Sequence, residues 1–72
     1  MVKAIVLVKS PKKLIAARLK RVHLVYESFP VSGQFDAVAV IKVESLAEIK
    51  NITTEIKKIY VVERTETMVE VQ

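Results

Sequence analysis

The sequence contains no cysteine, no tryptophan, one glycine, two prolines and one histidine in 72 residues. The missing cysteines exclude disulfides and thiolate metal sites, and a single histidine, His23, cannot by itself build a typical zinc site. One glycine is also too few for the glycine-rich fingerprints that cradle phosphates. We therefore expect neither a metal nor another cofactor.

Long hydrophobic segments are missing as well. No run approaches the ~20 residues that a membrane span needs. The apolar run Ala4–Val8 is too short for a signal sequence, because Lys9 ends it. The absence of cysteine fits a reducing compartment, so the sequence predicts a soluble cytoplasmic protein that does not bind membranes.

The chain is short, and its length predicts one domain that spans residues 1–72. A domain of this size buries only ~60% of the surface of its unfolded chain and is marginally stable alone. With disulfides and metals excluded, packing and self-association remain as sources of stability. Because 51% of the residues are hydrophobic, more than a small monomer can cover, we predict an oligomer.

The net charge of +4 is unevenly distributed. Residues 1–36 carry seven Lys or Arg and two acids, whereas residues 37–72 carry five Lys or Arg and six acids. Such a basic half could meet phosphate, but lysine-rich faces are ordinary on solvated helices. The basic cluster consists of Lys9, Lys12, Lys13, Arg18, Lys20 and Arg21.

Hydrophobic patterns and turn residues divide the first half of the chain into three elements. Val2–Val8 is apolar on both faces, as expected of a strand that is covered on both sides. Ser10 and Pro11 fit the N-cap and the first position of a helix, which we predict over Pro11–Arg21. Leu24–Val31 follows as a second strand.

The second half repeats these patterns. Phe35–Val43 is the most apolar strand, and the short turn before it predicts an antiparallel hairpin. Ser45 and Glu48 form a capping box at the start of a helix, and Tyr60–Val71 predicts a last strand. The apolar stripe of this helix has spacings of three and four residues. It consists of Leu46, Ile49, Ile52, Ile56 and Ile59.

The predicted order β-α-β-β-α-β has a preferred arrangement. Two right-handed β-α-β units give an α+β, ferredoxin-like fold, in which two helices pack on one face of a four-stranded antiparallel sheet. The central strands are apolar on both faces, so the other face of the sheet would be bare. Because a bare apolar face of that size marks an interface, we predict a two-fold dimer that pairs sheet to sheet.

Side chains that carry chemistry are few. As a general base His23 would need a partner in a pocket, and a histidine near a helix end more often contacts the helix dipole. The acidic residues are scattered over strands and helix starts, without a helical metal-binding pair. The central strands carry Ile, Val and Ala where RNA-binding sheets carry aromatics. We therefore predict no catalytic residue, no direct nucleic-acid binding and a protein that is not an enzyme.

The turn Val31–Asp36 is the candidate site. Its glycine can adopt a positive φ, and the turn then presents several backbone N–H groups beside one carboxylate. These groups suit the carboxylate and the ammonium group of an amino acid. The residues are Gly33, Gln34, Phe35 and Asp36, and the last strand adds the hydroxyls of Thr65 and Thr67. The alternative is a plain hairpin turn with a polar tip.

Four segments form a recognisable series. They are V-S-G-Q-F-D at residues 31–36, the apolar strand Ala37–Val43, Ser45-Leu46 at the start of a helix, and R-T-E-T-M-V at residues 64–69. This series resembles the RAM domain (regulation of amino-acid metabolism), the effector-binding domain of the Lrp/AsnC regulators, over essentially the whole chain. Those regulators usually begin with a helix-turn-helix domain. A chain that starts at the first RAM strand resembles the stand-alone RAM proteins of prokaryotes, chiefly archaea.

The resemblance implies sheet-to-sheet dimers that assemble into rings, commonly of four dimers. It also implies small effectors, typically amino acids, that bind between neighbouring dimers. A stand-alone copy can co-assemble with full-length relatives and modulate their DNA binding. By position, the matching site residues are Gly33, Gln34, Phe35, Asp36, Thr65, Glu66 and Thr67.

Two segments depart from the pattern of the family. Ile59–Val62 lacks the Pro-Gly turn of many members, and Ser28-Phe29-Pro30 precedes the glycine turn, so the effector chemistry can differ. Two other functions stay open on the sequence. One is a structural oligomerisation module without a ligand, and the other is a small dimeric α/β-barrel enzyme, which a pocket lined by His23 and a carboxylate would favour.

Overall fold

The computed structural model describes residues 2–12 and 14–71 and confirms the predicted order β-α-β-β-α-β. The six elements are β1 (Val2–Lys9), α1 (Ile15–Leu19), β2 (Val25–Pro30), β3 (Ala37–Val43), α2 (Leu46–Lys57) and β4 (Arg64–Val69). Lys13 of the basic cluster lies outside the described residues. In the described part of the chain, neither helix has the length and apolar character to cross a membrane.

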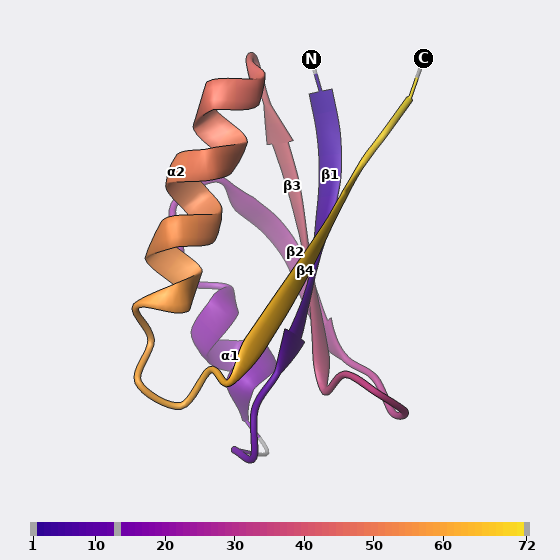
Figure 1. Ribbon diagram of the computed structural model, residues 1–72, viewed down its shortest axis with the longest axis vertical. Coiled ribbons are helices and arrows are strands. Elements are labelled where there is room, and N and C mark those ends of the chain that lie inside the picture. Colours follow the sequence, from indigo (N-terminus) through magenta and orange to yellow (C-terminus); the bar gives the residue numbers. More distant parts are fainter. Residues whose placement is uncertain (1, 13, 72) are drawn as a thin grey trace.

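The four strands form one sheet in the order β2-β3-β1-β4, and every neighbouring pair is antiparallel. Both helices lie on the same side of this sheet (Figure 1). The predicted ferredoxin-like fold is therefore confirmed. Because β1 lies between β3 and β4, Val8 near its end pairs with Ala37 on one side and Thr65 on the other. This register brings the turn before β3 and the start of β4 to the same end of the sheet.

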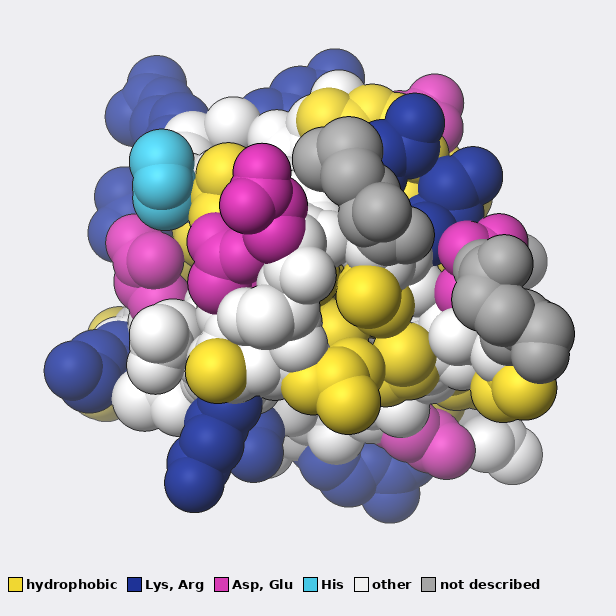
Figure 2. Space-filling model, turned by 90° about the horizontal axis from the view of Figure 1, so that it is seen from above, with side chains coloured by type: hydrophobic (Ala, Val, Ile, Leu, Met, Phe, Trp, Pro, Cys, Tyr) yellow, Lys and Arg dark blue, Asp and Glu magenta, His cyan; other side chains and the backbone are white. Residues whose placement is uncertain are grey.

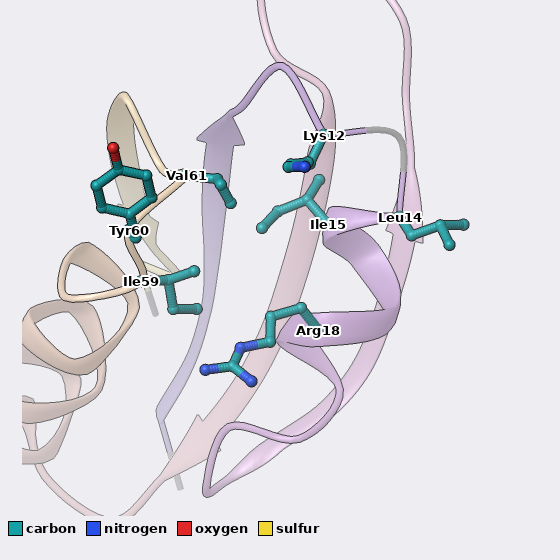
Figure 3. Close-up of a pocket in the computed structure, with 7 residues that line it drawn as sticks. All are labelled: Lys12, Leu14, Ile15, Arg18, Ile59, Tyr60 and Val61. Atoms are coloured by element: carbon teal, nitrogen blue, oxygen red, sulfur yellow. The ribbon is translucent and has the colours of Figure 1, made fainter.

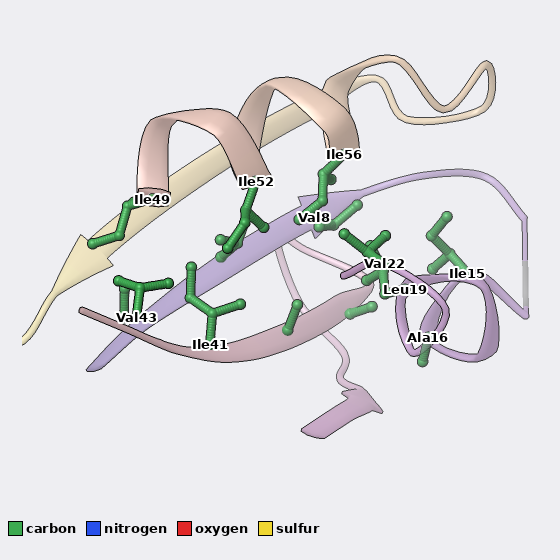
Figure 4. Packing of buried hydrophobic residues seen from close by; sticks show 14 residues of the cluster. Val8, Ile15, Ala16, Leu19, Val22, Ile41, Val43, Ile49, Ile52 and Ile56 are labelled. Atoms are coloured by element: carbon green, nitrogen blue, oxygen red, sulfur yellow. The ribbon is translucent and has the colours of Figure 1, made fainter. Parts of the chain in front are cut away.

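The hydrophobic core lies between the sheet and the two helices (Figure 4). Alternate residues of β1 and β3 face the helices, as the period of two in a strand requires. The predicted stripe of α2 supplies Ile49, Ile52 and Ile56, while Leu46 remains 63% exposed. The core residues are Ala4, Val6, Val8, Ile15, Ala16, Leu19, Val22, Ala37, Ala39, Ile41, Val43, Ile49, Ile52 and Ile56.

Helix α1 is much shorter than the predicted helix Pro11–Arg21. Ser10 is not its N-cap, because the helix begins at Ile15 and Leu14 occupies the N-cap position. The Ser10 hydroxyl does accept the N–H of Lys12, and the Ser10 N–H donates to Asp36 Oδ2, but this turn does not continue into the helix. Beyond Lys20 the backbone bonds shift to the i→i−3 pattern. Leu24 adopts a φ of 71°, a conformation that side-chain-bearing residues rarely take.

Strand β4 begins at Arg64, four residues later than the predicted start at Tyr60. Residues 59–62 form a turn instead, in which the Val62 N–H donates to the Ile59 carbonyl. The side chains of Val61 and Val62 are half-buried against the core. Their apolar character thus reflects packing of a loop, and the prediction of strand for this segment is wrong.

The predicted capping box of α2 is formed only in part. Ser45 occupies the N-cap with extended backbone angles, but its side chain makes no capping hydrogen bond. The Glu48 carboxylate reaches back past Ser45 and accepts the N–H of Glu44 at 2.9 Å. The sequence therefore predicted the start of α2 correctly. The hydrogen bond that Glu48 should make to the N–H of Ser45 is made to the N–H of Glu44 instead.

The sheet face opposite the helices is here called the open face. Its centre is apolar, with Ile5 and Leu7 from β1 and Val38 and Val40 from β3. Tyr26 and Phe29 lie towards the β2 edge and Met68 towards the β4 edge, and all three are between 41% and 51% exposed. The central strands β1 and β3 are therefore apolar on both faces at their centres, as predicted.

Both chain termini lie at the end of the sheet away from the glycine turn (Figure 1). Viewed towards that end, hydrophobic side chains gather in the middle, and most Lys and Arg side chains lie around the periphery (Figure 2). A cavity of about 210 Å³ opens between β1 and β4 near this end, lined in part by Ile5 and Met68. Charge and apolar surface are thus separated on this end of the molecule.

Candidate functional site

The candidate site begins with the turn of residues 31–36, which connects β2 to β3. Gly33 adopts a φ of +113°, and a Cβ atom added there would meet no heavy atom within 4 Å. The turn therefore needs glycine for its backbone angle alone, because space is not limiting. Ser32, Gly33 and Gln34 are exposed, so their backbone is open to a ligand or to another chain.

Asp36 ties this turn to the end of β1. Its Oδ2 accepts the backbone N–H of Ser10 at 2.8 Å. Its own N–H donates to the Val8 carbonyl at 2.8 Å, and its carbonyl accepts the Val31 N–H at 3.0 Å. Among the residues that the structure describes, Asp36 Oδ1 has no hydrogen-bond partner. The carboxylate thus holds the fold with one oxygen, and its other oxygen is unused among the described residues.

Phe35 connects the turn to β4. Its side chain is buried, and the Arg64 guanidinium carbon lies 5.2 Å from the centre of the ring. This distance is typical of a cation–π contact. Arg64 is the first residue of β4 and precedes Thr65. The contact therefore fixes the turn against the segment that supplies the second half of the predicted site.

Residues 65–67 of β4 divide between the two faces of the sheet. Thr65 pairs with Val8 and Thr67 with Val6, so both hydroxyls lie on the helix side, whereas Glu66 pairs with Leu7 and lies on the open face. Thr65 is two strand spacings, ~10 Å, from the start of β3. Thr67 lies a further ~7 Å along the strand. None of the seven predicted site residues lines the cavities of about 530, 320, 210 and 140 Å³ in the described chain.

In the described part of a single chain, the predicted site is an open rim that none of these cavities reaches. The turn and Arg64 lie together at one end of the sheet, Thr65 lies beside them, and Thr67 does not join them. Ligand pockets usually bury most of the ligand surface. A site at this turn would therefore need a second chain to cover it.

His23 lines a small cavity of about 140 Å³ together with Glu48 and Glu55. This arrangement is the one that would favour an enzyme. However, His23 is exposed, and the described residues include no hydrogen bond between it and either carboxylate. Glu48 Oε1 is already used as an acceptor for the Glu44 N–H. The described residues also contain no cluster of three or more His, Cys, Asp or Glu that could hold a metal.

A cavity of about 530 Å³ lies between α1 and the loop that joins α2 to β4. We call it the α1 cavity. Sequence patterns missed it because they place Tyr60–Val61 in a strand, whereas the structure places these residues in the loop that forms one wall. Two features of the sequence could have indicated this cavity. They are the basic residues Lys12 and Arg18, which line it, and the absence of a Pro-Gly turn after α2.

A family model described as the Lrp/AsnC ligand binding domain matches residues 3–72. Among solved structures, the protein TTHA0845 from Thermus thermophilus is similar with a TM-score of 0.90 and 26% identity, over 100% of this chain and 95% of that one. No curated protein matches the sequence significantly.

Two further solved structures share the fold. The hypothetical protein PHS023 from Pyrococcus horikoshii has a TM-score of 0.84 and 24% identity, covering 100% of this chain and 92% of that one. The protein FFRP-DM1 has a TM-score of 0.85 and 24% identity, covering 99% and 100%. At this identity the likeness concerns the fold alone.

Proposed function

Because the chain belongs to the Lrp/AsnC ligand binding domain family, whose members are regulatory effector-binding modules without catalytic activity, we propose that it senses an amino acid or a related small metabolite. The observation that carries this proposal is the turn of residues 31–36. Asp36 ties the turn to the end of β1, while Gly33 and Gln34 are exposed. Exposed backbone N–H groups in such a turn are suited to a carboxylate.

The working unit is a dimer formed through the open face. The apolar side chains in the centre of this face lose their water when two copies meet, which is the main driving force for association. Its margins carry both signs of charge, so that basic and acidic side chains of two copies can pair. They are Lys3, Lys9, Lys42, Arg64, Glu27 and Glu66. A two-fold axis brings the same patch of both copies together.

The effector lies where the turn of one dimer meets a neighbouring dimer. The N–H groups of Gly33 and Gln34 hold its carboxylate, and Asp36 Oδ1 holds its ammonium group. Phe35 keeps the turn in place through its contact with Arg64. The segment Thr65–Thr67 contributes from β4, with Thr65 closest to the turn. The missing wall of the site is therefore supplied by another chain.

Assembly and binding are coupled in this account. Dimers close into a ring of four in the cytoplasm, and an effector that contacts two dimers favours the assembled state only as far as it binds that state more tightly. Co-assembly with full-length Lrp/AsnC regulators would carry the signal to DNA. A structural module without a ligand is the competing function, and it would assemble to a size that ignores every metabolite.

Calorimetric titration of the folded oligomer with each of the twenty amino acids tests the proposal. Thr65→Val removes a hydroxyl with little change in shape and should weaken the binding of the effector roughly threefold to tenfold, as expected for one lost hydrogen bond. The matched control is Thr53→Val on α2, whose hydroxyl donates to the Lys50 carbonyl far from the turn. Absence of binding by all twenty amino acids would leave the structural module as the function.

A further inference from the structure

The α1 cavity uses residues that the proposed effector site leaves without a role. One wall consists of Lys12, Leu14, Ile15 and Arg18 around the start of α1, and the other consists of residues 59–61. Its volume of about 530 Å³ is within the range of small-molecule sites. The cavity therefore has room for a metabolite within one chain, in contrast to the exposed turn.

The floor and rim of the α1 cavity are apolar. Ile15 is buried at its base, and Ile59 and Val61 are half-buried. In Figure 3 the side chains of Ile15 and Ile59 extend toward each other across the space. Tyr60 stands at the rim and is 99% exposed. An apolar ligand that covers Ile15, Ile59 and Val61 would remove water from these side chains without desolvating a polar group on them.

The charge of the α1 cavity is one-sided. Lys12 and Arg18 both extend from the α1 side into the space (Figure 3), and the lining contains no acidic residue. Within the part of the chain that the structure describes, neither side chain has an ion-pair or hydrogen-bond partner. An anionic group at the mouth of the cavity could therefore pair with Lys12 and Arg18, while an apolar part of the same ligand contacts the apolar floor.

The same charges discriminate between classes of metabolite. A free amino acid would bring its ammonium group next to two cations, with no carboxylate in the lining to accept it. Burial of an unpaired charge is costly, and like charges repel. A carboxylate without an α-ammonium group avoids both costs, and guanidinium groups bind carboxylates in a well-matched geometry.

We propose that the α1 cavity is a second effector site, which binds an apolar monocarboxylate without an α-ammonium group, such as a branched-chain 2-oxo acid. The carboxylate lies between Lys12 and Arg18, and the aliphatic tail packs on Ile15, Ile59 and Val61. This site is independent of the turn and does not need a neighbouring chain. It gives a role to two members of the basic cluster that the fold itself does not require.

The test compares 4-methyl-2-oxopentanoate with leucine, which has the same side chain and an ammonium group in place of the oxo group. Calorimetry should detect the oxo acid, with binding at least about tenfold tighter than that of leucine at the same site. Methyl NMR signals of Ile15, Ile59 and Val61 should shift with the oxo acid. Arg18→Gln should weaken binding about tenfold or more, because a charge-assisted pair is lost, and Arg18→Lys should restore part of it.

The control is Lys20→Gln, which removes the same charge from an exposed position next to α1 that does not line the α1 cavity. It should change the affinity less than about twofold, because Lys20 does not contact the ligand and solvent ions screen its charge. Arg18 is exposed as well, so its variants should keep the wild-type melting temperature. The proposal is overturned if the oxo acid does not bind, if leucine binds equally well, or if the shifts occur at residues 31–36. The proposal is also overturned if the methyl signals of Ile15, Ile59 and Val61 shift when the protein is diluted without ligand. Such shifts would mean that a second copy of the protein occupies the cavity.

Discussion

Replacement of Asp36 by alanine should destabilise the protein strongly, although the residue was selected from the sequence as a ligand contact. The bond from the Ser10 N–H to Asp36 Oδ2 is 2.8 Å long and joins segments 26 residues apart. Ser10 is only 3% exposed, so the loss of the acceptor leaves a buried N–H without a partner. Such a change costs roughly 1.5–3 kcal/mol. For a domain of this size it lowers the melting temperature by about 6–24 °C.

The assay is thermal and denaturant unfolding, followed by circular dichroism at one fixed protein concentration, because association contributes to the apparent stability. Asp36→Asn keeps an acceptor oxygen and should lose roughly half as much free energy of unfolding, because neutral hydrogen bonds are weaker than charge-assisted ones. The matched control is Glu63→Ala, which removes an exposed carboxylate near the same end of β1. An Asp36→Ala variant that is no less stable than Glu63→Ala would refute the structural role of this carboxylate.

This role changes how ligand binding should be tested. If Asp36→Ala no longer binds the effector, the cause can be a distorted turn or the loss of a direct contact with the effector. The two causes are mixed because the same side chain holds Ser10. Thr65→Val does not have this defect, since the described residues include no hydrogen bond from the Thr65 hydroxyl. The two variants together separate the support of the turn from contact with the effector.

Four further variants test the fold by denaturant unfolding. Ile56→Ala should cost about 2–5 kcal/mol, because this side chain is fully buried in the core, and a cost below about 1 kcal/mol would contradict that packing. Gly33→Ala should lower the free energy of unfolding by about 1–2 kcal/mol, because alanine is strained at a positive φ. Steric clash does not add to this loss, because the space around Gly33 is open. An unchanged free energy of unfolding would mean that the turn adopts another backbone conformation. At the start of α2, Ser45→Ala should lower the free energy of unfolding by less than about 0.5 kcal/mol and Glu48→Ala by about 0.5–1 kcal/mol. The reason is that only the Glu48 side chain makes a capping hydrogen bond. A larger loss for Ser45→Ala than for Glu48→Ala would contradict the observed cap.

Local patterns predicted most of the architecture, and the failures have a common physical origin. The stripe Ile49, Ile52 and Ile56 and the alternation in β1 are properties of neighbouring residues, so they identify α2 and the central strand directly. The end of β1 is bonded to Asp36, 26 residues away, and no local pattern contains such a contact. The positive φ of Leu24 likewise has no signal in the sequence.

The candidate site was predictable to a similar extent. A single glycine between two apolar strands indicated the turn and its positive φ, which the structure confirms at Gly33. Strand alternation separates Glu66 from its two neighbouring threonines, and the contact between Phe35 and Arg64 links the turn to β4. The α1 cavity could not be predicted, because it exists only when residues 59–61 form a loop.

The central claim is that this domain works as an oligomer whose site at the turn is completed by a neighbour and filled by an amino acid. Light scattering after size separation, at tens of micromolar protein with and without each amino acid, tests it most directly. We predict a mass of at least twice the 8.1 kDa of one chain and a change in mass with at least one amino acid. Leu7→Lys on the open face should reduce the mass to that of one chain and abolish the response. A wild-type mass of 8.1 kDa, unchanged by all twenty amino acids, would contradict the account.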